Sequence, residues 1–173
     1  MHLMKQNRFK MKSPPKIERE FVSIIQEHSQ IINKVCYFYA SNNMPFDDLR
    51  QEIYINIWLG LSKFRGESKL STWIYRVAVN SALMTLRSSK PRIETVPLNF
   101  EILNATTEID DTQRENLQTI QTLINRLEDF EKAIILLWLD DYSYDEIAEI
   151  LGLKRNTIAV KIHRIKQKLS KSF

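Results

Sequence analysis

Glycine and proline are scarce in this chain, with three and five residues respectively among 173. Folds built from many short strands need these residue types at their turns, because glycine adopts left-handed backbone conformations and proline fixes turn geometry. Hydrophobic residues make up 43% of the chain, which is ample for burying a core. The composition therefore predicts an all-α protein built from long helices.

Hydrophobic spacing predicts the individual helices. Apolar side chains recur every three to four residues over residues 17–41, which predicts one long amphipathic helix. Asn42 to Pro45 interrupt this pattern, and a second helix is expected over residues 46–64. Ser71 is placed to cap a third helix that continues to about Arg87. Further helical spacing begins near Thr112.

These breaks predict two small helical domains joined by a flexible linker. Residues 1–16 carry five Lys and Arg and no acidic residue, and we expect a basic disordered arm there. The first domain is expected over residues 17–92, the linker over residues 93–112, where periodicity is lost, and the second domain over residues 113–173.

Charge is segregated along the chain, although the net charge is only +4. Residues 94–131 hold nine acidic residues against two arginines, whereas residues 154–173 hold seven Lys and Arg and no acidic residue. A basic run of this kind is often only a solvated surface. Its position after an acidic segment favours a polyanionic partner.

Several function classes lack the residues that they need. His2, His28 and His163 lie far apart without the spacing of metal ligands, and no phosphate-binding glycine loop or nucleophile motif is present. We therefore expect no catalytic residue, metal or cofactor, and an enzyme is the least favoured reading. The single Cys36 has no disulfide partner, and no apolar stretch is long enough to span a membrane, so we expect a cytoplasmic protein.

A helix-turn-helix is predicted near the C-terminus. Ser143 and Glu146 have the spacing of a capping box, in which each residue's side chain binds the backbone N–H of the other. Gly152 can adopt the left-handed conformation of a tight turn, and Leu153 follows as a core residue. Small Ala148 allows a second helix to pack closely across the first.

The second helix, expected from about Asn156, has one apolar and one polar, largely cationic face. The apolar stripe is formed by Ile158, Ile162, Ile165 and Leu169, and the opposite face by Thr157, Lys161, Arg164, Lys168 and Lys171. Many surface helices are rich in lysine, but that alternative does not account for the capped helix and glycine turn before it. The N-terminal turn of such a helix enters the major groove, so base contacts are expected from Arg155, Asn156, Thr157 and Lys161. Phosphate contacts are expected from Arg164, Lys168 and Lys171.

The first domain contains four distinctive segments, namely Asp48 to Glu52 (DLRQE), Trp58, residues 64–66 (FRG) and residues 69–80 (KLSTWIYRVAVN). In this order they resemble the sigma-70 family, and specifically the extracytoplasmic-function (ECF) sigma factors. Together with a C-terminal helix-turn-helix, the resemblance covers nearly all of residues 17–173. It implies a sigma-2 domain, a sigma-4 domain and a linker between them.

The resemblance also implies roles for particular residues. The resemblance implies that Asp48, Leu49, Gln51 and Glu52 dock on the β′ subunit of core RNA polymerase. It also implies that the −10 promoter element is recognised and melted by Lys69, Thr72, Trp73, Arg76 and Asn80. Trp73 or Tyr75 could stack on an unpaired base, but either is equally well explained as a core residue. The helix-turn-helix is then the −35 reader, through Arg155, Asn156, Thr157, Lys161, Arg164 and Lys168.

The recognition helix departs from the pattern of the family. Many members have a sequence close to T-V-K-S-R, whereas this chain has Ala159 and Lys161 in place of the first basic residue and the arginine. Lysine cannot form the bidentate contact by which arginine reads guanine, so the −35 base preference is left open.

The expected function is that of an alternative sigma factor that starts transcription. Its expected partners are bacterial core RNA polymerase, through the β′ and β subunits, promoter DNA and an anti-sigma factor. The alternative is a free-standing helix-turn-helix regulator. That alternative gives no reason for the segments at residues 48–52 and 69–80.

Overall fold

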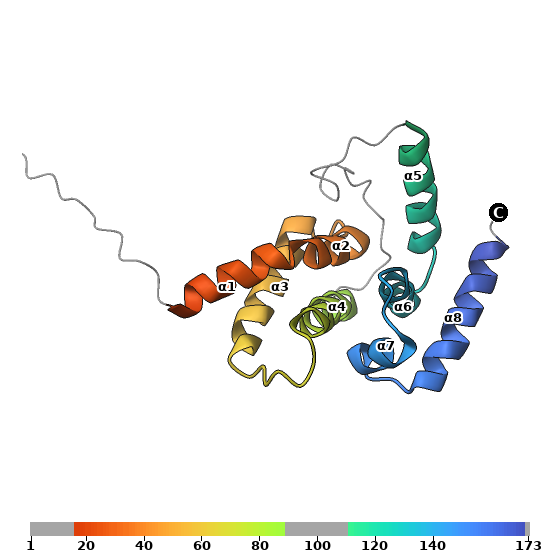
Figure 1. The fold of residues 1–173 in the computed structure, drawn as a ribbon. Coiled ribbons are helices and arrows are strands. Elements are labelled where there is room, and N and C mark those ends of the chain that lie inside the picture. Colours follow the sequence, from red (N-terminus) through yellow and green to blue (C-terminus); the bar gives the residue numbers. More distant parts are fainter. Residues whose placement is uncertain (1–15, 89–110, 172–173) are drawn as a thin grey trace, which may run out of the picture.

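The computed structural model describes residues 16–88 and 111–171, which form helices with no strand among them (Figure 1). The N-terminal unit consists of α1 (Lys16–Glu27), α2 (Ser29–Tyr39), α3 (Phe46–Leu61) and α4 (Leu70–Ser88). The C-terminal unit consists of α5 (Asp111–Asn125), α6 (Asp129–Leu139), α7 (Tyr144–Leu151) and α8 (Arg155–Ser170). The prediction of an all-α fold is confirmed.

The single long helix predicted over residues 17–41 is wrong, because His28 separates α1 from α2. His28 leaves helical geometry with φ −106° and ψ 17°, although its N–H still binds the carbonyl of Ile24 at 3.0 Å. The apolar spacing continues through this break, since Ile24 and Ile32 on either side are both buried. Periodicity therefore identified the buried face but not the break.

The predicted cap of the third helix is also wrong. Helix α4 begins at Leu70, so Ser71 lies inside its first turn. Helix α3 ends at Leu61, and Phe64 lies in the turn before α4, where its ring packs 5.3 Å from that of Trp73. Gly60 permits this packing, because a Cβ atom there would lie 2.8 Å from the Trp73 ring.

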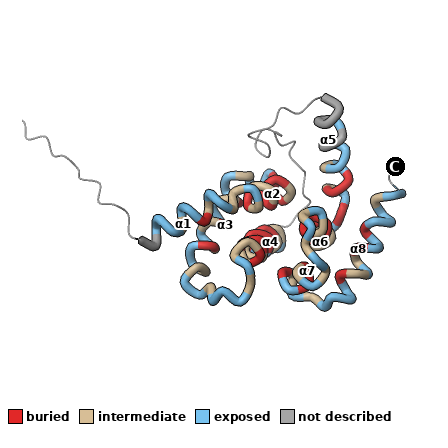
Figure 2. Tube along the Cα trace, in the orientation of Figure 1, coloured by how far each residue is buried: buried red, intermediate tan, exposed pale blue. Residues whose placement is uncertain are grey.

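The core of the N-terminal unit lies between α2, α3 and α4. Ile32, Ile53, Ile57 and Ile74 are each fully buried, and Figure 2 shows the buried residues of α4 on the side facing its neighbours. Full burial of one such side chain stabilises the fold by roughly 1.5–3 kcal/mol. This packing fixes which faces of α3 and α4 point to solvent.

The two units pack against each other through α4, which contacts both α6 and α7 (Figure 1). The Tyr39 hydroxyl donates to the carbonyl of Asp129 at 2.6 Å, and the Lys132 ammonium donates to the carbonyl of Phe38 at 3.1 Å. The buried side chains of the two units form one continuous cluster. Residues 1–15 of the predicted arm and residues 93–110 of the predicted linker lie outside the described residues. Lys16, the last position of the predicted arm, begins α1, and the last two linker positions, 111 and 112, belong to α5.

Candidate nucleic-acid interface

The helix-turn-helix is formed by α7, the turn at Gly152 and α8. The Ser143 N–H donates to Glu146 at 2.9 Å, and the Glu146 N–H donates to the Ser143 hydroxyl at 3.3 Å, which completes the predicted capping box. The Ser143 N–H and the Ser143 hydroxyl, the latter at 2.8 Å, both donate to the Glu146 carboxylate, and they lower the pKa of Glu146 below its usual value because they favour the charged form. Gly152 has φ 67°, and the Leu153 N–H returns to the carbonyl of Ala148 at 2.9 Å. The predicted turn is confirmed.

Helix α8 presents an apolar face to α6 and α7 and polar residues to solvent. Ile158, Ile162 and Ile165 are buried, whereas Lys154, Arg155, Asn156, Thr157 and Arg164 are exposed. Lys161 is half-buried, so it is less accessible than its place on the cationic face implied. The first turn of α8 therefore offers a cluster of exposed polar and basic side chains to a major groove.

Two of the basic side chains on α8 that are predicted to bind DNA already form ion pairs within the protein. Arg155 lies 3.4 Å from a carboxylate oxygen of Asp145 and 6.0 Å from the centre of the Tyr144 ring. Lys168 lies 2.6 Å from Glu131, whose side chain is only 12% exposed. The side chains of Arg155 and Lys168 are both more than half exposed, so their ion pairs are weak and DNA phosphates can replace the acidic partners.

Helix α4 carries the predicted −10 residues, but they do not share one face. Lys69, which precedes the helix, and Asn80 are exposed, and Arg76 is half-buried. Thr72 is 3% exposed and Tyr75 is fully buried, so neither side chain is available to DNA in this structure, and neither is kept as a proposed contact. Tyr75 is buried against the C-terminal unit, where its ring lies 5.6 Å from that of Tyr142.

Trp73 is half-buried and packs against Phe64 and Gly60. Of the two readings that its sequence position allowed, packing is the one that the structure supports. Its ring packs between the C-terminal end of α3 and the start of α4.

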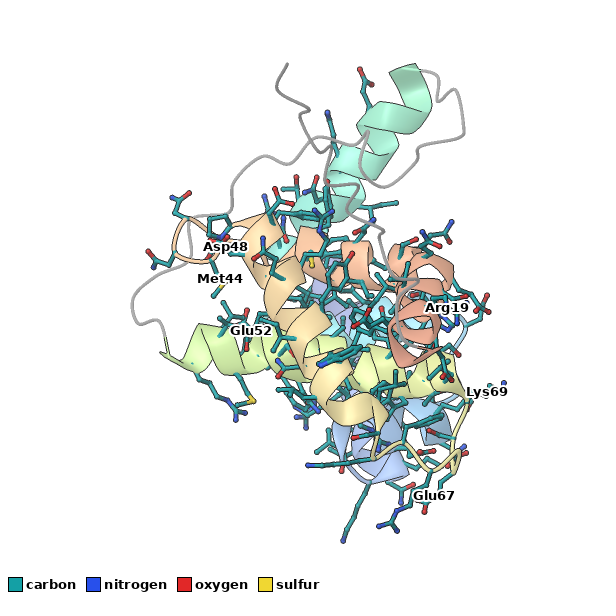
Figure 3. All side chains as sticks on the ribbon, turned by 90° about the vertical axis from the view of Figure 1, so that its left-hand side faces the viewer. Arg19, Met44, Asp48, Glu52, Glu67 and Lys69 are labelled. Atoms are coloured by element: carbon teal, nitrogen blue, oxygen red, sulfur yellow. The ribbon has the colours of Figure 1, made fainter. Side chains whose placement is uncertain are left out.

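Helix α3 carries the predicted polymerase-docking residues (Figure 3). Asp48, Gln51 and Glu52 are exposed, but Leu49 is only 1% exposed, and its prediction as a surface contact is corrected because it packs in the core. The three polar residues continue along the helix into two exposed apolar residues, Ile55 at 53% and Leu59 at 61%. Positions 48, 51, 52, 55 and 59 form one stripe at helical spacing.

The sequence reasoning missed the apolar half of this stripe. Ile55 and Leu59 follow Glu52 at three- and four-residue intervals, which is a signal that the sequence already contained. They were not recognised because an apolar residue on a helix is most simply assigned to the core. Exposed apolar residues beside polar ones are typical of protein-binding surfaces.

A groove between α3 and α4 connects the docking stripe with the −10 residues. Its lining includes Glu52 and Asn56 on α3 and Asn80 and Ser81 on α4. The Asn56 amide donates to Ser81 at 3.0 Å and to Glu52 at 3.3 Å, and so fixes α3 against α4. A partner bound on α3 therefore lies next to any nucleic acid bound on the exposed side of α4.

Acidic residues of α7 contact the basic residues of α4. Arg76 donates to the carbonyl of Glu149 at 2.8 Å and to its carboxylate at 3.1 Å, and Lys69 lies 3.9 Å from Glu146. Near them the Tyr75 hydroxyl donates to Asp140 at 3.2 Å. These contacts join residues far apart in sequence and were not predicted.

Within residues 16–88 and 111–171, no group of three His, Cys, Asp or Glu side chains could hold a metal ion. No helix of this part of the chain is long and apolar enough to cross a membrane. The arrangement that does stand out is a helix-turn-helix with exposed basic side chains, packed against a second helical unit. Fold and site together are those of a DNA-binding protein built from two helical units.

Comparison with known proteins narrows this class. Residues 24–92 match the family model for sigma-70 region 2, and residues 117–169 match that for sigma-70 region 4. The ECF RNA polymerase sigma-E factor of Escherichia coli K12 is 31% identical over 83% of this chain and 81% of its own length. The ECF RNA polymerase sigma factor SigW of Bacillus subtilis is 29% identical over 87% of both chains. The chain belongs to the family of ECF RNA polymerase sigma factors and functions in transcription initiation.

Solved structures share the fold. CnrH, solved in complex with the cytosolic domain of CnrY, matches with a TM-score of 0.61 and 19% identity over 89% of this chain and 87% of its own. The sigma factor RpoE of Bartonella quintana, solved with the anti-sigma factor NepR, matches with a TM-score of 0.62 and 17% identity over 89% and 94%. Sigma factors are non-enzymatic initiation factors, and the alternative of a free-standing regulator is not favoured.

Proposed function

We propose that this chain is an alternative sigma factor that docks on core RNA polymerase through α3, opens the −10 element with α4 and holds the −35 element with α8. The observation that supports it best is the exposed stripe on α3, formed by Asp48, Gln51, Glu52, Ile55 and Leu59. The stripe overlaps residues 48–52, the segment that resembles the polymerase-docking helix of the sigma-70 family. The proposed domains are residues 17–92 for core and −10 binding and 113–173 for −35 binding, with a linker between them.

The stripe on α3 has the chemistry of a helix-docking surface. Its acidic end can pair with basic residues of the polymerase, and its apolar end can be desolvated against another helix. We place the β′ subunit on this stripe. The β subunit is proposed as the further contact of the sigma-4 domain.

Lys69, Arg76 and Asn80 are the proposed −10 contacts. Lys69 and Arg76 supply positive charge for the DNA backbone, and Asn80 has an amide that can pair with a base edge. Asn80 lines the groove between α3 and α4, so polymerase docking and −10 binding are adjacent on the same unit.

The proposed −35 contacts lie on α8. Arg155, Asn156 and Thr157 are exposed in its first turn, and half-buried Lys161 follows one turn later. Arg164 and Lys168 are proposed to contact the phosphates of the −35 DNA. Because Lys161 stands where the family pattern has arginine, we propose that this chain reads its −35 element without a bidentate guanine contact at that position.

We further propose an anti-sigma factor as an inhibitory partner and the cytoplasm as the site of action. The solved relative RpoE was crystallised with the anti-sigma factor NepR, which supports the first proposal. No catalytic residue is proposed, because the chemistry of transcription belongs to the polymerase.

Core binding tests the proposal directly. The wild-type chain should co-elute with bacterial core polymerase, and Glu52→Arg should weaken binding about ten-fold, because it places positive charge against the proposed basic site. Glu20→Arg, an equally exposed change on α1, is the matched control and should bind as the wild type does. Failure of the wild type to bind core, or equal binding by both variants, would contradict docking through α3.

A further inference from the structure

Helix α8 exposes one large apolar side chain, that of Val160. Val160 is 50% exposed, and among the residues of α8, all of which the structure describes, no other large apolar side chain is exposed to this extent. Single exposed apolar residues are common on protein surfaces, so exposure alone assigns no role to Val160. Its position among the polar residues of the helix decides what it can contact.

Val160 points directly away from the core. Successive residues of a helix are turned by about 100°, so Val160 lies about 200° round the helix from Ile158 and from Ile162. Both isoleucines are buried on the side of α8 that packs against α6 and α7. Asn156 and Arg164, four residues before and after Val160, are exposed on the same side as Val160. Val160 is therefore the central residue of the outward face of α8.

The charges around Val160 are complementary to DNA. Helix α8 contains no acidic residue, and Arg155 and Arg164 are exposed on it before and after Val160. The helix is also the second of a helix-turn-helix, the one that lies in the major groove in proteins of this kind. Duplex DNA is therefore the partner that fits this face, and Val160 would lie at its centre, against the edges of the bases.

Only one base offers an apolar group to such a side chain. Thymine carries a C5 methyl group at the major-groove edge, and the other three bases do not. Of the three successive residues Ala159, Val160 and Lys161, only Val160 is exposed, and the other two are half-buried. The residue that presents most surface to the bases in this part of α8 is thus a hydrocarbon and cannot form a hydrogen bond.

We propose that Val160 is a specificity-determining residue of the −35 contact, and that its methyl groups pack on the C5 methyl of one thymine in the major groove. This inference rests on the proposed function, in which α8 holds the −35 element. At this point of the element the chain selects an A·T pair by an apolar contact. The part played by hydrogen-bonding side chains elsewhere on the helix is unaffected.

Selection from a randomised −35 element tests the preference. Holoenzyme formed from core polymerase and the full-length chain is given a pool of duplexes of a promoter that it transcribes, with the −35 element randomised. The wild type should enrich thymine at one position of one strand. Val160→Ala should reduce that enrichment about three- to five-fold, because it removes the methyl groups that make the contact, and should leave the other positions unchanged. Val22→Ala, which changes a valine of α1 that is 51% exposed, is the matched control and should select as the wild type does.

A single uracil isolates the methyl group. Uracil has the hydrogen-bonding groups of thymine and lacks only the C5 methyl. Replacing the selected thymine by uracil should weaken binding of the duplex by wild-type holoenzyme about three- to five-fold. Val160→Ala should bind the thymine and uracil duplexes equally, because the partner of the methyl group is gone. A purely structural role of Val160 would leave the difference between the two duplexes as it is in the wild type.

Equal binding of the two duplexes by the wild type, or unchanged thymine enrichment in Val160→Ala, would overturn the contact. Weaker core binding by Val160→Ala would overturn it as well, since Val160 would then face the polymerase. In each of these cases a wild-type holoenzyme that still selects a −35 sequence leaves the proposed function intact. A wild-type chain that binds no core, or a holoenzyme that selects no −35 sequence, would instead contradict the proposed function itself.

Discussion

Two tyrosines are buried at the junction between the units. Tyr39 is 3% exposed and Tyr75 is fully buried, and their hydroxyls donate to Asp129 and Asp140 respectively. Burial raises the pKa of both side chains above the usual value, because the phenolate cannot be hydrated there. A group with a raised folded-state pKa stabilises the fold fully below its unfolded pKa of about 10 and loses this contribution as pH rises further.

Tyr75→Phe tests this ionisation. Loss of the hydroxyl removes the hydrogen bond to Asp140 and should lower the free energy of unfolding by about 1 kcal/mol at neutral pH. The variant should also lose less stability than the wild type between about pH 9 and pH 11, because it has no phenol to ionise at this position. Urea unfolding at both pH values checks it. Tyr144→Phe, on the half-buried side of α7, is the control, and an equally steep alkaline loss in Tyr75→Phe would contradict the account.

Gly152 is required for its backbone conformation. Its φ of 67° is left-handed, and a Cβ atom there would meet no atom within 4 Å, so strain alone opposes a side chain. Gly152→Ala should therefore lower the free energy of unfolding by about 1–2 kcal/mol, whereas Gly152→Asn should cost less, because asparagine tolerates this region. Thermal unfolding of both variants measures the difference. Equal stability of Gly152→Ala and the wild type would be inconsistent with the turn.

The conformation of some residues could be predicted from their neighbours in sequence, whereas the burial of others could not. The capping box at Ser143 and the turn at Gly152 depend on residues a few positions apart, so the sequence predicts them directly. Thr72 was assigned to DNA but is buried, because the side of a helix that meets the core depends on its neighbours in space. Leu49 was assigned to the polymerase, although its spacing with the buried Ile53 and Ile57 already indicated the core.

Helices were predicted better than their ends. The buried faces of α3 and α8 follow from apolar spacing, which the sequence shows without ambiguity. The break at His28 was missed because the apolar spacing continues across it, from buried Ile24 to buried Ile32, and no glycine or proline marks it. The residues of the predicted linker that lie between positions 93 and 110 are outside the described structure.

The phosphate contact proposed for α8 can be measured through its salt dependence. Arg164 is exposed on this helix, and a phosphate contact from it would release counterions on binding. Arg164→Ala should weaken binding to duplex DNA to a similar extent for different sequences and reduce the slope of log affinity against log salt by about 1. Gln167→Ala, at a neutral exposed position of α8, should leave the slope unchanged. An unaltered slope in Arg164→Ala would remove Arg164 from the phosphate contacts.

In the whole molecule, the arrangement of the two units was the least predictable feature. Arg76 and Glu149 are 73 positions apart, and Tyr75 and Asp140 are 65 apart, so no local pattern reports their contact. The family resemblance implied two domains and a linker, which says nothing of how the domains meet.

The proposed function of this chain is to direct core RNA polymerase to promoters. Its most direct test is transcription from a library of genomic fragments by purified bacterial core polymerase, with the 5′ ends of the transcripts mapped by sequencing. The account predicts defined start sites, preceded by shared −10 and −35 sequences, that arise only when the full-length chain is added to core. Transcripts that start at the same positions with core alone, or no defined starts when the chain is present, would contradict it.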